Sequence, residues 1–401
     1  MRRAVSTVLV VLFVVAPSSA AWARAGWKMR IDRLTAGRKI GVAVREESRF
    51  LYKHQTKRRR VPASNQKLLL SMALFDTLGP SRQIETTAAT QVLQQPVLKG
   101  DLWLLGRGDP SVSGGGRFGR VLPFEPTRLG ALARAVRDAG VRRVEGRVVG
   151  NTGYFAHDWF APGWKSDFAE KWIALPTALS FEGNAHDGRH ISDPELRAAG
   201  ALTKKLENVG VRVMGKPAAA QAPADLVDIA SVSSQPLFVM ARYMNRWSSN
   251  FFAEVFGKRL GVERSGAPGT IAKGAAAIAS WAAGLGVRLV AHDSSGLSYE
   301  NKVAPGGMVR LLGFAEDQTW GDDLRDSLAA AGEGTLRERL RGVRLRAKTG
   351  TLDGISTLSG YVWLRRRDTW AEFSILSRGM SKSLASAIED DILRILARYG
   401  R

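Results

Sequence analysis

Cysteine is absent from the 401-residue sequence, and histidine occurs only five times. The lack of cysteine excludes disulfide bonds, thiolate metal sites and a cysteine nucleophile. His186 and His190 are four residues apart, but the intervening Gly188 indicates a loop and not a metal-binding helix face. We therefore expect no metal and no other cofactor, and the serine residues become the main candidates for chemistry.

Two common motifs are also missing. No Gly-x-Ser-x-Gly sequence occurs, which argues against a Ser-His-Asp hydrolase. No glycine-rich phosphate loop with a following lysine is present either. If a serine nucleophile exists, a residue other than histidine is expected to activate it.

Long apolar runs are missing except at the amino terminus. Residues 8–15 are apolar throughout, follow the basic Arg2 and Arg3, and precede the small residues of Ala21-Trp22-Ala23. This order predicts a signal peptide over residues 1–23 and an exported chain in the periplasm or cell envelope. The alternative is a retained membrane anchor, although the run is shorter than the roughly 20 residues of a spanning helix.

Acidic residues are scarce relative to basic ones. The chain has 59 Lys and Arg against 37 Asp and Glu, a formal net charge of +22. Such a charge attracts polyanions. Because an exported chain rarely meets nucleic acid, the basic runs Lys57-Arg58-Arg59-Arg60 and Arg365-Arg366-Arg367 indicate attraction to anionic envelope polymers and no nucleic-acid partner.

The apolar pattern suggests a larger domain in two pieces, residues 24–84 and 232–401. A hairpin is predicted at residues 39–45 and 50–54, and an amphipathic helix begins at Ser64 and ends at Gly79. Helices follow at residues 236–247, 251–260 and 270–285. Two strands at 355–364 and 369–377 and a helix at 384–399 complete the prediction.

Residues 85–231 differ from the rest of the chain in amino-acid composition and apolar pattern. They are rich in glycine and proline, with short apolar segments such as 144–149 and one clear helix at residues 128–139. This composition predicts an inserted smaller domain. With 45% apolar residues over the whole chain, two domains can each bury a core.

Ser64-Asn65-Gln66-Lys67 contains a candidate nucleophile and its base. A lysine three residues after a serine on a helix lies on the same face, where it can accept the hydroxyl proton. The lysine must be neutral for this, and burial or a nearby cation such as Lys348 would lower its pKa. A helix-capping serine followed by an exposed lysine is the alternative interpretation.

Ser248-Ser249-Asn250 and Lys348-Thr349-Gly350 could complete such a site. On a turn between helices, Ser248 could pass a proton to a leaving amine while Asn250 holds a substrate amide. Lys348 and Thr349 suit a substrate carboxylate, and Gly350 followed by Thr351 would let a substrate backbone approach a strand edge. Taken singly, these motifs are also typical of a helix cap and a turn.

In this order, the motifs resemble the penicillin-binding D-alanyl-D-alanine carboxypeptidases and endopeptidases that carry a domain inserted between Ser-x-x-Lys and Ser-x-Asn. Further similar phrases are Gly108-Asp109-Pro110, Asp293-Ser294-Ser295-Gly296 and Gly334-Thr335-Leu336. The resemblance implies an α/β (α+β) fold of the transpeptidase-like, β-lactamase-like type. A central antiparallel sheet would be flanked by helices, with a smaller inserted domain.

The resemblance also implies the reaction. Ser64 would attack a peptidoglycan stem peptide, Lys67 would take its proton, Ser248 would protonate the leaving amine, and β-lactams would be covalent inhibitors. The backbone N–H groups of Ser64 and Thr351 would form the oxyanion hole. Asp167, after Pro162-Gly163-Trp164, would bind the amino group of the stem peptide's third residue.

The chain departs from the family pattern in two places. Ser249 replaces a residue that is acidic in many relatives, and the insertion is short, with residues 185–224 the expected place of trimming. These departures leave carboxypeptidase or endopeptidase preference open. A serine β-lactamase and a catalytically weak envelope-binding protein remain alternatives.

Overall fold

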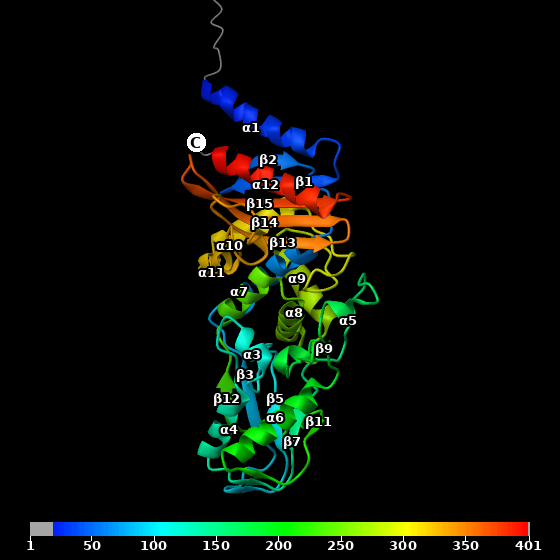
Figure 1. The fold of residues 1–401 in the computed structure, drawn as a ribbon, viewed down its shortest axis with the longest axis vertical. Coiled ribbons are helices and arrows are strands. Elements are labelled where there is room, and N and C mark those ends of the chain that lie inside the picture. Colours follow the sequence, from blue (N-terminus) through cyan, green and yellow to red (C-terminus); the bar gives the residue numbers. More distant parts are fainter. Residues whose placement is uncertain (1–18, 400–401) are drawn as a thin grey trace, which may run out of the picture.

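A five-stranded antiparallel sheet lies at one end of an elongated molecule (Figure 1). The computed structural model describes residues 19–399. The predicted hairpin is confirmed, and it pairs with the carboxyl-terminal strands to complete the sheet. In spatial order the strands are β13 (Leu345–Leu352), β14 (Ile355–Leu364), β15 (Thr369–Arg378), β1 (Ile40–Glu46) and β2 (Arg49–His54).

Helices cover both faces of this sheet. On one face α12 (Lys382–Tyr399) packs against β14, and its Ile392 and Leu396 share one buried core with Phe373; α1 (Ser19–Thr35) lies beside α12. On the other face α10 (Pro305–Glu316) lies below Tyr361 and Leu376. Because side chains alternate along a strand, β15 buries Phe373 and Ile375 on one face and Leu376 on the other.

The segment that carries Ser64 is not the amphipathic helix that was predicted. Ser64 lies in a short 3-10 turn, η1 (Ala63–Asn65), directly before α2 (Gln66–Leu78). Gly79, with φ of 78°, ends α2 as predicted. Residues 66–75 are buried on all sides, because α2 runs through the middle of the helical layer and packs mainly against four helices. These are α7 (Leu237–Trp247), α8 (Asn250–Ser265), α9 (Ile271–Gly284) and α10.

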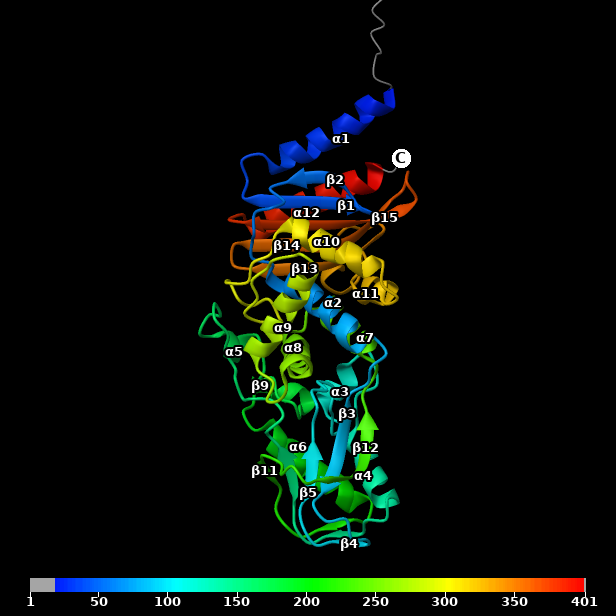
Figure 2. The same ribbon diagram turned by 180° about the vertical axis from the view of Figure 1, so that it is seen from behind.

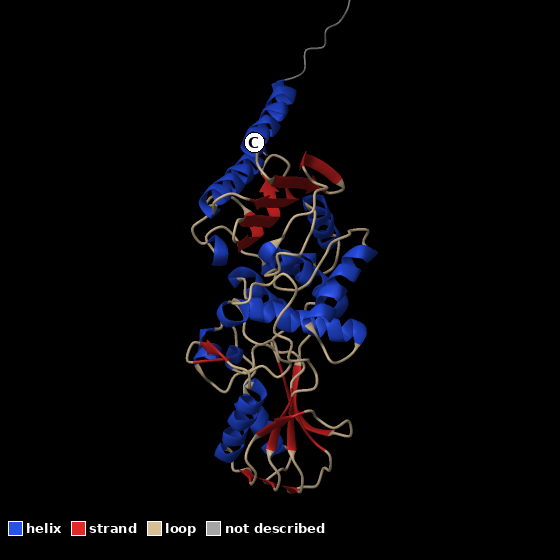
Figure 3. Cartoon of the chain, turned by 90° about the vertical axis from the view of Figure 1, so that its right-hand side faces the viewer, coloured by secondary structure: helices blue, strands red, loops and turns tan. Residues whose placement is uncertain are grey.

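A second sheet lies at the far end of the molecule (Figures 1 and 3). It is mixed, with β3 antiparallel to β5 and β12, and with β7 parallel to β5 and β11. Its strands are β3 (Glu85–Thr90), β5 (Leu102–Leu105), β7 (Val148–Asn151), β11 (Ala218–Ala220) and β12 (Val227–Ser233). Smaller sheets join β4 (Val97–Leu98), β6 (Arg143–Val144) and β10 (Arg212–Val213), and β8 (Ala185–His186) with β9 (Arg189–His190).

The prediction of one helix in this part of the chain was wrong. The expected helix is α4 (Leu129–Asp138), and it packs against a longer helix, α6 (Pro194–Asn208). The buried face of α6 includes Ala198, Ala199 and Leu202. Small alanine side chains give a weak apolar pattern, which is why the helix was missed. The other helices of the described chain are α3 (Arg117–Val121), α5 (Phe168–Lys171), η2 (Glu182–Asn184), α11 (Gly321–Ser327) and η3 (Gly334–Leu336).

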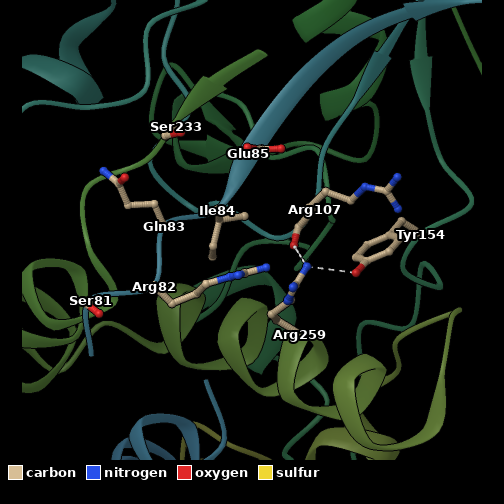
Figure 4. Close-up of a pocket in the computed structure, with 9 residues that line it drawn as sticks. All are labelled: Ser81, Arg82, Gln83, Ile84, Glu85, Arg107, Tyr154, Ser233 and Arg259. Carbon is tan, nitrogen blue, oxygen red and sulfur yellow. Dashed lines mark hydrogen bonds between the residues drawn. The ribbon is translucent and has the colours of Figure 1, made fainter. Parts of the chain in front are cut away.

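The chain passes between the two halves of the molecule at two adjacent points. The backbone N–H groups of Ile84 and Ser234 each donate to the other residue, at 2.9 Å to Ser234 Oγ and 2.9 Å to the Ile84 carbonyl. A cavity of about 580 Å³ lies beside this crossing (Figure 4). There Arg259 of α8 donates to the Tyr154 hydroxyl at 2.9 Å and to the Arg107 carbonyl at 3.3 Å, which ties the helical layer to the second half.

Only part of the predicted signal peptide falls within the described residues. Residues 1–18 of the predicted signal peptide lie outside the described residues, and residues 19–23 belong to α1. Within residues 19–399, no helix has the length and apolar character needed to cross a membrane.

We expect the core of the first sheet to be sensitive to truncation at Phe373, which is completely buried. Phe373→Ala should lower the free energy of unfolding by about 3–5 kcal/mol, because it leaves a cavity between the sheet and α12. Phe160→Ala is the matched control, since that side chain is 57% exposed. Urea unfolding followed by circular dichroism measures both, and equal losses would contradict the prediction.

Candidate active site

Three distant segments meet at the β13 edge of the first sheet. Ser64 lies in η1, Ser248 lies between α7 and α8, and Lys348 lies on β13. Lys67 Nζ lies 3.3 Å from Ser64 Oγ and 2.8 Å from Asn250 Oδ1. Lys348 Nζ donates to Ser248 Oγ at 2.9 Å. The structure therefore brings the three motifs into one hydrogen-bonded cluster. Figure 2 shows the elements that carry or flank the motifs, with β13 at the edge of the sheet that is nearest to α2, α7 and α8.

The Ser64 turn is tied directly to the sheet. Asn65 Nδ2 donates to the Lys348 carbonyl at 2.7 Å, and Asn65 Oδ1 accepts from Ser359 Oγ of β14 at 2.8 Å. Ala63 has a φ of 46°, a conformation that costs energy for a residue with a Cβ atom. The fully buried Asn65 side chain thus holds a strained turn in register with the strand that carries Lys348.

Lys67 is completely buried, and its ammonium has three acceptors within reach. Besides Ser64 and Asn250, the Ser295 carbonyl lies 2.5 Å from Nζ. Burial lowers the pKa of Lys67 to about 7, against the opposing effect of Asp293 and Glu254. A neutral lysine has two N–H donors and one lone pair. When Asn250 and Ser295 take the two donors, the lone pair is left for the Ser64 hydroxyl.

Burial also has the largest effect on Lys348. It lowers the pKa of Lys348 well below its ordinary value, and the charges of Lys67 and Lys382 lower it further. Of the two causes that the sequence suggested for a lowered pKa of Lys67, burial or a nearby cation such as Lys348, burial is the one that acts. Removal of the Lys67 side chain from water is sufficient.

Two carboxylates position the loop beside Lys67, and neither was assigned a role from the sequence. Glu254 Oε1 accepts the backbone N–H groups of Ser294 at 2.9 Å and Ser295 at 2.7 Å, and burial raises the pKa of Glu254 to about 8. Asp293 accepts from Gly296 N at 2.9 Å and from Trp164 Nε1 at 2.7 Å. The family-like phrase beginning at Asp293 and the position of Glu254, one helical turn after Asn250, were the available signals.

The capping interpretation applies to Ser249 and not to Ser248. Ser249 Oγ accepts the N–H of Phe252 at 3.3 Å and caps α8. Ser248 has left-handed backbone angles, φ 59° and ψ 38°, and its hydroxyl accepts from Lys348. Asn250 Nδ2 also donates to the Trp172 carbonyl at 3.0 Å, so the segment after α5 reaches the site.

Atoms of the protein itself fill the space beside Gly350. A Cβ atom there would lie 2.2 Å from Thr357 Oγ1, 2.9 Å from Ser64 N and 3.0 Å from the Pro62 carbonyl. Glycine is thus required for the Ser64 turn to pack on β13, whereas the sequence suggested only room for a substrate. Thr349 Oγ1 donates to Thr335 Oγ1 at 2.8 Å, and Thr351 is exposed on the strand.

Asp167 lies away from this cluster of hydrogen bonds. Its exposed carboxylate accepts from Lys171 Nζ at 3.0 Å, and that contact lowers the pKa of Asp167. Only four residues separate it from Trp172, whose carbonyl accepts a hydrogen bond from Asn250. Within residues 19–399, no group of three or more His, Asp or Glu side chains could hold a metal ion.

The fold and the site together define a class. A buried lysine beside a serine, next to an antiparallel sheet whose edge strand carries a second lysine, is the arrangement of a serine peptidase with a penicillin-binding, transpeptidase-like fold. In agreement, a family model described as the D-Ala-D-Ala carboxypeptidase 3 (S13) family matches residues 30–187 and 183–399. The chain belongs to this family, and the protein is a serine-type carboxypeptidase/endopeptidase hydrolase.

Individual relatives agree with the family match. The D-alanyl-D-alanine carboxypeptidase of Actinomadura sp. (strain R39) is 28% identical over 452 residues, covering 90% of this chain and 80% of the relative. Penicillin-binding protein 4 of Haemophilus influenzae superposes with a TM-score of 0.77 at 20% identity, covering 92% of this chain and 99% of that one. A complex of the same protein with a β-lactam, also 20% identical, gives a TM-score of 0.70, covering 92% and 100%. The predicted fold class is confirmed.

The ionisation of Lys67 predicts a pH dependence of acylation. If the neutral amine of Lys67 is the base, the rate of acylation by penicillin should rise as the pH increases through about 7. Asp293→Asn removes the carboxylate that most opposes the lowered pKa of Lys67, so the midpoint should move to lower pH. Stopped-flow measurement between pH 5 and 9 tests this. Glu263→Gln, which changes a partly exposed carboxylate outside the hydrogen-bonded cluster of Lys67, should leave the midpoint in place, and an unmoved midpoint in Asp293→Asn would contradict the assignment.

Proposed function

We propose that Ser64 is the nucleophile of an acyl-enzyme D,D-peptidase and that Lys67 is its base. The observation that carries this proposal is the position of Lys67 Nζ, 3.3 Å from Ser64 Oγ, with Asn250 and Ser295 available for its remaining N–H groups. Ser64 Oγ attacks the carbonyl carbon of the penultimate D-alanine while its proton passes to Lys67. The C–O bond forms, and the peptide C–N bond then breaks.

The second half of the cluster suits the departure of the leaving group. Ser248 donates its proton to the amine of the leaving D-alanine and regains one from the ammonium of Lys348, which it contacts at 2.9 Å. The proton on Lys67 then passes to Lys348, which restores the neutral amine of Lys67 and the charge of Lys348. Water attacks the acyl-enzyme and gives a proton to Lys67, which returns one to Ser64 Oγ as the ester C–O bond breaks and the shortened stem peptide is released. The backbone N–H groups of Ser64 and Thr351 form the oxyanion hole, where one donor is typically worth about 2.7–4 kcal/mol.

Substrate binding changes the ionisation of Lys348. Lys348 and Thr349 hold the terminal carboxylate, and Asn250 orients the stem-peptide amide. A carboxylate beside Lys348 favours its charged form, which offsets the burial that lowers its pKa in the free protein. Lys348 thereby becomes the cation that the leaving-group step requires once substrate is present.

The chain is proposed to be built from a catalytic domain, residues 24–84 and 232–401, with residues 85–231 inserted. Residues 1–23 act as a signal peptide that sends the protein to the periplasm or cell envelope. Its substrates are peptidoglycan stem peptides, and β-lactams acylate Ser64. Attraction to anionic envelope polymers follows from the net charge of +22.

Removal of the Ser64 hydroxyl tests the reaction. Ser64→Ala should lose the covalent penicillin adduct and reduce hydrolysis of purified peptidoglycan by at least about 10³-fold, because no other group can form the acyl bond. Ser383→Ala, an exposed serine on α12, is the control. Chromatography and mass spectrometry of the digests separate release of D-alanine from cleavage of cross-links. A penicillin adduct that persists in Ser64→Ala would refute the proposal, and rapid release of hydrolysed drug by the wild type would favour a β-lactamase.

Asp167 is proposed to bind the free amino group of the stem peptide's third residue, after exchanging its contact with Lys171. Asp167→Asn should reduce kcat/KM about tenfold for peptides with that free amine, since a charge-assisted hydrogen bond is lost. Peptides acetylated at the same amine should be cleaved equally by both proteins. Equal losses on both kinds of peptide would show that Asp167 acts only on local structure.

A further inference from the structure

Six basic side chains line a small pocket at one end of the first sheet, and none of them belongs to the catalytic cluster. The pocket has a volume of about 170 Å³, and its other lining residues are Val61, Ile355 and Ser377. We call it the six-cation pocket, after Lys39, Arg58, Arg59, Arg60, Lys302 and Arg378.

Strand register brings these six residues together from distant parts of the sequence. Arg378, at the end of β15, pairs with Ile355 of β14 and donates its N–H to the Lys39 carbonyl at 2.9 Å. Arg60 and Val303 exchange two backbone hydrogen bonds at 2.8 and 2.9 Å, which places Lys302 beside the Arg58-Arg59-Arg60 segment. The fold therefore assembles this group of charges from separate segments, and only three of the six residues belong to one basic run of the sequence.

The charge of the pocket is not compensated within the described residues. None of the six side chains forms an ion pair with a carboxylate of residues 19–399, and no acidic residue lines the pocket. Burial and the neighbouring Arg58 lower the pKa of Arg60; burial and Arg378 lower that of Lys302, with Glu300 acting in the opposite direction. Arg60 is 8% exposed, and its Nε has no hydrogen-bond partner. Cations held together in this way favour a bound anion.

We propose that the six-cation pocket binds the phosphate groups of an envelope phosphodiester polymer. Four of the six side chains are arginines, whose planar guanidinium groups match phosphate oxygens in pairs. Exposed Lys57 precedes Arg58 in the sequence and adds a positive charge next to the lining segment, which suits a chain of phosphates better than a single phosphate. The inference rests on the proposed location in the cell envelope and is independent of the roles given to Ser64 and Lys67.

The pocket lies close to the segment that carries Ser64, so binding there would place a polymer near the candidate active site. An adjoining cavity of about 360 Å³ shares Val61, Lys302, Ile355 and Arg378 with the pocket and extends to Asp353, in the turn between β13 and β14. Val61 packs with Ala63, the residue before Ser64. A polymer bound in the pocket would therefore hold the enzyme against the cell wall next to the strand that carries Lys348.

The experiment measures binding of the full-length protein to poly(glycerol phosphate) by isothermal titration calorimetry. Arg58→Glu/Arg59→Glu changes two exposed lining residues. Arg365→Glu/Arg366→Glu is the matched control, because it changes the net charge equally at two exposed arginines outside the pocket. The pocket variant should bind at least about tenfold more weakly and the control within about twofold of wild type, with binding that weakens as salt increases.

Other probes distinguish phosphate recognition from general charge. Polygalacturonate supplies carboxylates, and phosphatidylglycerol vesicles supply phosphates on a lipid surface. Equal losses in both variants, or equal affinity for poly(glycerol phosphate) and polygalacturonate, would overturn the proposal. Tighter binding to vesicles would assign the pocket to a membrane instead. Release of D-alanine from a small soluble peptide should be unchanged in both variants, so that failure of this proposal is distinguishable from failure of the catalytic one.

Discussion

The complete burial of the Lys67 amine is the constraint on which the rest of the site depends. An ammonium removed from water is costly unless hydrogen bonds compensate it, and here Asn250, the Ser295 carbonyl and Ser64 surround it. The same burial lowers the pKa of Lys67 to about 7, so that the amine can serve as a base near neutral pH. The buried environment makes Lys67 both a structural anchor and a reactive group.

Several features of the fold exist to maintain this environment. Residues 66–75 of α2 are buried on all sides, and this burial keeps water away from Lys67. Glu254 positions the loop that presents the Ser295 carbonyl, and Asn65 ties the Ser64 turn to β13. Gly350 permits that turn to approach the strand, where any side chain would collide with Ser64 N. Catalytic geometry and packing are thus supplied by the same few contacts.

The two concentrations of positive charge in the molecule differ in kind. Lys67 and Lys348 are buried, and burial favours the neutral form of each in the free protein. The six-cation pocket is open to solvent, and most of its side chains remain able to attract a large anion from a distance. The net charge of +22 reflects exposed basic residues such as those of the pocket. It gives no information about the ionisation of the two buried lysines.

Much of the fold and of the candidate site could be predicted from residue order and periodicity. Alternating apolar residues located β1, β14 and β15, and the spacing of Ser64 and Lys67 predicted that these two side chains lie close together, because both depend on short-range geometry. The periodicity of α6 was obscured by its small alanines, and the burial of residues 66–75 of α2 depends on helices that are remote in sequence. The contacts of Glu254, Asn65 and Gly350, and the gathering of six cations from separate segments, were decided by tertiary structure alone. Local pattern determines which elements form, whereas strand register and packing determine which side chains meet.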